Sequence, residues 1–109
     1  MNIPTLIVAG DNDRSQLTVL GPEWFTDAYY LSPGANALVN LFGGEHMLGG
    51  ISGYLVTETT DENPNRVHAV QRLTWAYLRS ALYPNDNAWM DACTWIAANP
   101  NPQGNVIIK

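Results

Sequence analysis

Basic residues are scarce in this sequence. Its 109 residues include five Lys and Arg against ten Asp and Glu, which gives a formal net charge of −5. The bases are scattered along the chain, at Arg14, Arg66, Arg72, Arg79 and Lys109. A protein that binds nucleic acid or an anionic membrane surface needs clustered cations to neutralise phosphates. We therefore expect neither nucleic acid nor a membrane among the partners of this chain.

Cysteine and long apolar runs are also lacking. The single cysteine, Cys93, cannot form a disulfide within the chain. No apolar run approaches the roughly 18 residues of a membrane-spanning helix, and the first residues lack the basic start and apolar stretch of a secretory signal. These absences predict a cytoplasmic protein, with secretion left open if an N-terminal portion precedes this chain.

The chain does contain enough apolar sequence for a hydrophobic core. Hydrophobic residues make up 46% of it, and a chain of this length buries about two-thirds of its unfolded surface. Residues 3–10 form a continuous apolar run closed by a glycine, which is typical of a strand buried on both faces. Residues 35–42 are a second strand candidate, and they run into Gly43 and Gly44.

Helical patterns fill the segments around these strands. Residues 22–31 begin with a proline at an allowed first-turn position and predict a short helix. Asn63 suits an N-cap, and Pro64 begins an amphipathic helix that Pro84 ends. Asp86 can cap a further helix, which stops within residues 99–102. Residues 104–109 are a candidate edge strand.

The order strand, helix, strand, helix, helix predicts the α/β class with a parallel sheet. Two strands and a candidate edge strand are too few for such a sheet, which needs further strands and helices on both faces. We therefore expect residues 1–109 to form a single partial domain, incomplete by itself.

Ionisable side chains follow both predicted strands. Asp13 comes three residues after Gly10, and His46 comes three residues after Gly43. Loops that follow parallel strands emerge at the same carboxyl edge of a sheet, where ligand and catalytic sites are usually found. We expect Asp13 and His46 to be neighbours there. A carboxylate beside an imidazole fixes its tautomer and stabilises its protonated form.

Both segments resemble a known family. Residues 3–13 resemble the seventh-strand segment of α/β-hydrolase-fold serine hydrolases, and residues 43–50 resemble the loop that carries the histidine of these enzymes. The helices that follow resemble their closing helices, so the resemblance covers essentially the whole chain. It is closest to the branch of dienelactone hydrolases and chlorophyllase-like esterases.

The resemblance implies a function for the loop residues. Asp13 corresponds to the acid of a catalytic triad, and His46 to the general base and acid. Asp11, on the same loop, is the second candidate for the acid. The expected activity is hydrolysis of carboxylic esters or related acyl bonds in small-molecule substrates, with no cofactor. The non-catalytic interpretations are an Asx-rich turn for the aspartates and a surface loop position for His46.

The nucleophile of the family is missing. Its serine lies on a Gly-x-Ser-x-Gly turn that precedes the acid and the histidine, and no such turn occurs here. Ser52 comes nearest, but it follows His46 and lacks the second glycine. We expect the chain alone to be inactive and a complementary N-terminal portion to supply the serine and the oxyanion hole. The alternative is a non-catalytic hydrolase-like remnant that self-associates or binds a partner protein.

Other candidate sites have weaker patterns. Glu45, His46 and His68 lack the spacing of metal ligands, and Asp11 and Asp13 begin a calcium-loop pattern that the following residues do not continue. Metal binding is therefore not expected. Cys93 has apolar neighbours and is expected to pack in the core. Core packing is also the expected role of the aromatic residues Trp24, Phe25, Tyr29 and Tyr30, and the alternative is that they line an acyl pocket.

Overall fold

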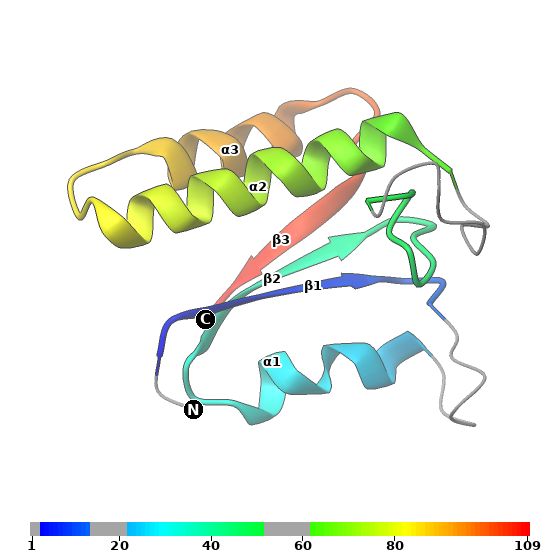
Figure 1. Cartoon of the computed structure of the whole chain (residues 1–109), viewed down its shortest axis with the longest axis horizontal. Helices are drawn as coiled ribbons and strands as arrows, with labels where there is room; N and C mark the ends of the chain where they lie inside the picture. The colour runs from blue at the N-terminus through cyan, green and yellow to red at the C-terminus, as the bar shows by residue number, and fades with distance from the viewer. Residues whose placement is uncertain (1–2, 14–21, 52–61) are drawn as a thin grey trace.

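A computed structural model describes residues 3–13, 22–51 and 62–109 of the chain. The strands are β1 (Thr5–Gly10), β2 (Ala35–Leu41) and β3 (Gly104–Ile108). The helical elements are the 3-10 helix η1 (Pro22–Thr26), α1 (Asp27–Leu31), α2 (Pro64–Leu82) and α3 (Ala88–Ala98). The sheet separates two helical layers, with α1 on one face and α2 and α3 on the other (Figure 1). The chain thus has an α/β architecture.

The sheet is mixed, with strand order β1-β2-β3. β1 and β2 are parallel as predicted, with Leu6 opposite Ala37 and Gly10 opposite Leu41. The candidate edge strand does form, but β3 pairs with β2 in the antiparallel sense. The expectation of a purely parallel sheet is therefore wrong. The helices α2 and α3 run in opposite directions (Figure 1), so they return the chain to the carboxyl edge of β2, and the next strand has to run back.

Each face of the sheet has its own apolar cluster. Against α2 and α3 the buried residues are Val39, Leu41, Ala69, Leu73, Ala76, Ala92 and Ile96. Against α1 they are Ala9, Tyr29, Ala35 and Leu38. β2 contributes to both clusters, because successive side chains of a strand point to opposite faces. The central strand is thus buried on both sides.

α2 begins and ends where the sequence predicts. The side-chain oxygen of Asn63 accepts hydrogen bonds from the backbone N–H groups of Asn65 and Arg66, both at 3.1 Å. Pro64 occupies the first turn, where its missing N–H costs no hydrogen bond. The last helical residue is Leu82, two before Pro84. The Asn63 cap thus fixes the first turn of α2, which lies beside the loop carrying His46.

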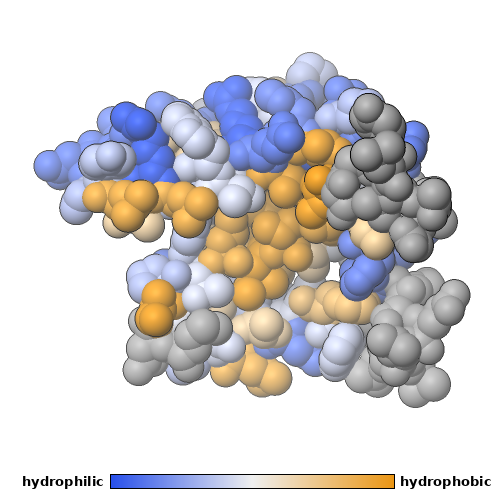
Figure 2. Space-filling view, viewed as in Figure 1, coloured by the Kyte–Doolittle hydropathy of each residue, from blue (hydrophilic) through white to orange (hydrophobic). Residues whose placement is uncertain are grey.

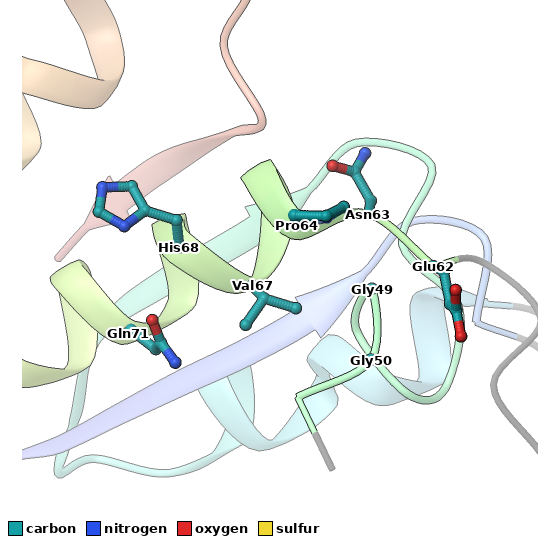
Figure 3. Close-up of a pocket in the computed structure, with 8 residues that line it drawn as sticks. All are labelled: Gly49, Gly50, Glu62, Asn63, Pro64, Val67, His68 and Gln71. Atoms are coloured by element: carbon teal, nitrogen blue, oxygen red, sulfur yellow. The ribbon is translucent and has the colours of Figure 1, made fainter. Parts of the chain in front are cut away.

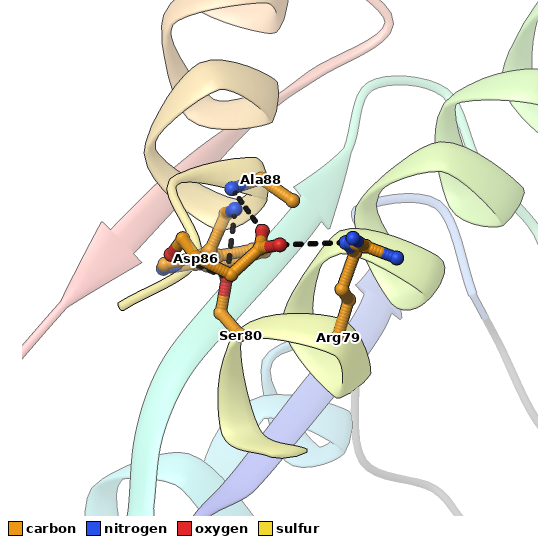
Figure 4. Close-up of polar contacts among 5 residues, drawn as sticks. Arg79, Ser80, Asp86 and Ala88 are labelled. Carbon is orange, nitrogen blue, oxygen red and sulfur yellow. Dashed lines mark hydrogen bonds and ion pairs between the residues drawn. The ribbon is translucent and has the colours of Figure 1, made fainter. Parts of the chain in front are cut away.

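The turn between α2 and α3 is held by Asp86 (Figure 4). Its Oδ1 accepts a hydrogen bond from the Ala88 N–H at 2.7 Å, and its Oδ2 accepts one from Arg79 Nε at 2.6 Å. The Ser80 hydroxyl accepts a hydrogen bond from the Trp89 N–H at 3.0 Å. The N-cap residue of α3 is Asn87, whose side chain makes no cap hydrogen bond. The predicted capping hydrogen bond is made by Asp86 from one position earlier, and Asp86 also links the start of α3 to the end of α2.

The predicted helix over residues 22–31 forms as two short pieces, η1 and α1. Tyr29 is buried against the sheet, with 3% of its surface exposed, whereas Tyr30 is 60% exposed. Core packing is thus confirmed for Tyr29 and wrong for Tyr30, because one turn of helix directs adjacent side chains to different sides.

β1 lies at an edge of the sheet and pairs only with β2 among the described residues. Leu6, Ile7 and Val8 are all half-buried, unlike the buried residues of β2. Figure 2 shows an apolar band between the two helical layers, over the region where Figure 1 places β1. The apolar strand predicted to be buried on both faces is therefore only half covered.

Candidate active site

The loops after β1 and β2 lie against each other at the carboxyl edge of the sheet. The Asn12 N–H donates to the Gly44 carbonyl at 2.9 Å, and the Asp11 N–H donates to the Leu41 carbonyl at 3.0 Å. A Cβ atom on Gly10 would lie 2.2 Å from the Gly44 oxygen, so a larger residue cannot occupy this position without moving the loops. The glycine that closes β1 permits this contact.

Asp13 and His46 meet across these loops. His46 Nδ1 lies 3.2 Å from Asp13 Oδ1 and 3.3 Å from Asp13 Oδ2. The Asp13 side chain is 7% exposed and that of His46 is 66% exposed. The structure thus places side by side the two residues that the sequence assigned to adjacent loops, with the carboxylate buried and the imidazole open to solvent.

This geometry favours one tautomer of His46. A buried carboxylate beside Nδ1 accepts a hydrogen bond from that nitrogen, so the neutral ring carries its proton on Nδ1. The assignment leaves Nε2 with a lone pair that can accept a proton. When it does so, the negative Asp13 stabilises the resulting imidazolium. The pair can therefore act as a general base that later returns the proton.

Asp11 has a different partner. Its Oδ1 accepts a hydrogen bond from the Gly43 N–H at 2.7 Å, and its side chain lies on the exposed side of the loop. Asp11 therefore braces the two loops against each other, whereas Asp13 contacts the imidazole. The two candidates that the sequence left open for the acid are separated by this geometry.

Phe25 lies beside His46, with ring centroids 6.0 Å apart and the planes tilted by 58°. Trp24 packs edge-on against Phe25 at 5.0 Å and is 44% exposed. Core packing was predicted for both residues. This prediction is confirmed for Phe25, which is partly buried and packs against the apolar cluster on the α1 face of the sheet, and it is wrong for the exposed Trp24. Phe25 also lies next to the exposed imidazole, because η1 packs along β1 near its carboxyl end. Only the position of these residues in the connection between the two strands could have indicated this.

The other candidate residues lie elsewhere. His68 packs edge-on against Trp95 of α3, with centroids 5.6 Å apart. Burial raises the pKa of the Cys93 thiol, which is the opposite of the shift that makes a nucleophile. Within residues 3–13, 22–51 and 62–109, no three His, Cys, Asp or Glu side chains gather as a metal site. Ser52 lies outside the described residues.

A cavity of about 330 Å³ opens between the first turns of α2 and the stretch that follows His46 (Figure 3). Gly49 and Gly50 form one wall, and Val67 and Gln71 of α2 form part of the other. Neither Asp13 nor His46 lines it. The cavity therefore neighbours the His46 loop without containing the reactive groups.

Among the residues that the structure describes, no helix has the length and apolar character needed to cross a membrane. Comparison of the chain with protein-family models, with curated protein sequences and with solved structures finds no significant match. The site consists of a buried carboxylate paired with an exposed imidazole at the carboxyl edge of two parallel strands.

Proposed function

We propose that this chain is the C-terminal segment of an α/β-hydrolase-fold serine hydrolase, in which Asp13 is the acid and His46 the general base. The observation that carries this proposal is the distance of 3.2 Å between His46 Nδ1 and the buried Asp13 carboxylate. The parallel strands and the resemblance of both loops to that family support it. The class of substrate is a small carboxylic ester or a related acyl compound.

The proposed reaction needs a serine hydroxyl from a portion of the enzyme outside this chain. His46 Nε2 takes the proton of that hydroxyl as its oxygen attacks the ester carbonyl carbon. The resulting tetrahedral intermediate collapses, and His46 gives the proton to the departing alcohol. Water then attacks the acyl-serine with His46 again as base, which releases the acid and regenerates the serine. Asp13 stabilises the imidazolium in both halves.

The test joins this chain to an N-terminal portion that carries the serine. We would fuse this chain to the N-terminal portion of a dienelactone-hydrolase-like esterase that ends before its acid-bearing strand, and measure hydrolysis of p-nitrophenyl acetate. His46→Ala should lower kcat by about 10³-fold or more, since it removes the base of the triad. His68→Ala is the matched control, because the second histidine packs on Trp95, and it should leave kcat unchanged.

Two outcomes would contradict the proposal. One is a fusion protein that folds, carries the serine and shows no hydrolysis above its His46→Ala variant. The other is an active fusion in which His46→Ala and His68→Ala behave alike. The chain without the N-terminal portion should show no activity that depends on His46.

The alternative is a non-catalytic, hydrolase-like domain that binds a partner through the open edge of β1. The apolar band in Figure 2 and the lack of a second strand beside β1 among the described residues favour it. Partner binding of this kind should survive Asp13→Asn and His46→Ala, whereas the catalytic proposal requires both residues. The two functions are therefore separable with the same variants.

A further inference from the structure

The loop that carries His46 rests on an arginine of α2. Arg66 lies in the first turn of that helix and is 8% exposed. Its Nη2 donates a hydrogen bond at 3.0 Å to the carbonyl of Phe42, the residue just before the loop. Charged side chains are rarely buried, because removing them from water is unfavourable unless polar groups receive them. The buried Arg66 guanidinium therefore needs polar partners, and the Phe42 carbonyl is one of them.

Both ends of the loop contact the same side chain. Gly43 and Gly49 have φ angles of 68° and 88°, which favour glycine. A Cβ on Gly43 would lie 3.2 Å from Arg66 Nη2, and a Cβ on Gly49 would lie 3.0 Å from Arg66 Cβ. The guanidinium thus lies under the beginning of the loop, and the aliphatic stem lies under its end.

Arg66 is itself held in place by the cap of α2. The Asn63 side chain accepts a hydrogen bond from the Arg66 N–H at 3.1 Å, and the Asn63 N–H donates to the Gly49 carbonyl at 2.9 Å. On the opposite side of the loop, the Asp11 carboxylate accepts a hydrogen bond from the Gly43 N–H. The loop is therefore clamped between the β1 loop and the start of α2, and His46 lies midway between the two glycines.

We propose that Arg66 is a positioning residue, which sets the conformation of the Gly43–Gly49 loop so that His46 Nδ1 faces Asp13. Arginine suits this role because its planar guanidinium can reach a backbone carbonyl while its stem packs under Gly49. Lysine ends in a compact ammonium group on a shorter side chain, without the planar fork of donors, and should hold the loop less well. A role of Arg66 in catalysis rests on the proposed function, whereas its role in the loop conformation does not.

The test follows the tautomer of His46 in the complete chain. A ¹⁵N spectrum of the imidazole at alkaline pH, where the ring is neutral, reports the fraction of molecules with the proton on Nδ1. Wild type should hold mainly this form. In Arg66→Met the ratio of the Nδ1-protonated to the Nε2-protonated ring should fall about fivefold, the change in an equilibrium constant expected when one ordinary hydrogen bond no longer holds the loop. Arg66→Lys should give a smaller decrease.

The matched control is Arg72→Met on the same helix. Arg72 lies over the Trp95 ring at 4.5 Å, on the side of α3, so its loss should leave the His46 tautomer unchanged. A folded Arg66→Met protein with the wild-type tautomer would overturn the positioning role. If Arg66→Met does not fold, Arg66→Lys takes its place. A folded Arg66→Lys protein with the wild-type tautomer would then overturn the positioning role. A wild-type ring protonated on Nε2 would instead refute the Asp13 contact and with it the proposed function.

Discussion

Asp11 and Asp13 are two residues apart on one loop, yet they contact different parts of the molecule. Asp13 is buried and faces the imidazole, whereas Asp11 is exposed and holds the Gly43 N–H. Sequence alone ranks Asp13 first only through the resemblance to hydrolases. The backbone turn that brings the Asp13 N–H within 3.3 Å of the Gly10 carbonyl separates the two carboxylates in space.

We predict that asparagine at the two positions has very different effects in the fused enzyme. Asp13→Asn should lower kcat by about 10⁴-fold, because an amide can donate to His46 Nδ1 and so favours the wrong tautomer. Asp11→Asn keeps an oxygen that can accept the Gly43 N–H, so kcat should stay within about threefold of wild type. Steady-state kinetics of both variants provide the measurement, and the reverse ranking would identify Asp11 as the acid.

At the scale of elements, the hairpin of α2 and α3 depends on a few polar side chains at its turn. Asp86 accepts the Ala88 N–H and the Arg79 Nε–H at once. The hydrogen bond from Ala88 and then the contact with Arg79 hold the pKa of Asp86 below its ordinary value of 3.8. The ionised form is therefore favoured in the folded state.

This pKa shift predicts a dependence of stability on acid. A carboxyl whose pKa is lower in the folded state stabilises the fold fully above its unfolded pKa, and this contribution is lost as the pH falls through the folded value. Urea unfolding of wild type and Asp86→Asn should therefore show a difference at neutral pH that shrinks below pH 3.8, the ordinary pKa. Asp91→Asn removes one negative charge from the same helix start and is the control. A difference between wild type and Asp86→Asn that is constant with pH would refute the role of the ionised carboxylate.

At the scale of the whole molecule, β1 forms an edge of the sheet, and its outer side pairs with no other strand that the structure describes. Natural edge strands usually carry charges, prolines or bulges that prevent pairing with another chain. Pro4 and the register shift between Thr5 and Leu6 lie at the start of β1. Residues 6–10 carry no charge, and α2 above them contains no Asp or Glu despite the net charge of −5. Two copies that meet along this edge would bring no acidic side chains of β1 or α2 together. We therefore expect the isolated chain to associate through β1.

A proline placed at the open edge tests this association. The N–H groups of Thr5 and Asp11 point toward the β2 side, donating to Gly34 and Leu41, and strand alternation directs that of Val8 the other way. Val8→Pro should thus block a new strand while leaving the β1–β2 pairing intact. Sedimentation velocity over a range of concentrations should show a larger species in wild type and a monomer in this variant.

Val8→Ala is the control for that experiment, because it removes the same packing atoms but keeps the N–H group. It should associate as wild type does. A wild-type chain that remains monomeric at every concentration would refute the association, and equal behaviour of the two Val8 variants would exclude pairing through the β1 edge.

The sequence by itself determined the local elements and their order. The cap at Asn63, the prolines at 64 and 84, and the apolar runs that end in glycine all act within a few residues, and the strands and α2 formed where these signals lie. The parallel order of the first two strands also placed Asp13 and His46 at one edge. Periodicity and capping suffice here because they depend on neighbouring residues alone.

Only the tertiary structure decided what lies around that pair. The direction of β3 depends on where the helix hairpin returns the chain, and the contacts of Phe25 with His46 and of Arg66 with Phe42 join residues far apart in the sequence. These contacts depend on loop backbones with positive φ at Gly43 and Gly49. No local pattern encodes such distances, because they arise only when the strands, loops and helix ends pack together.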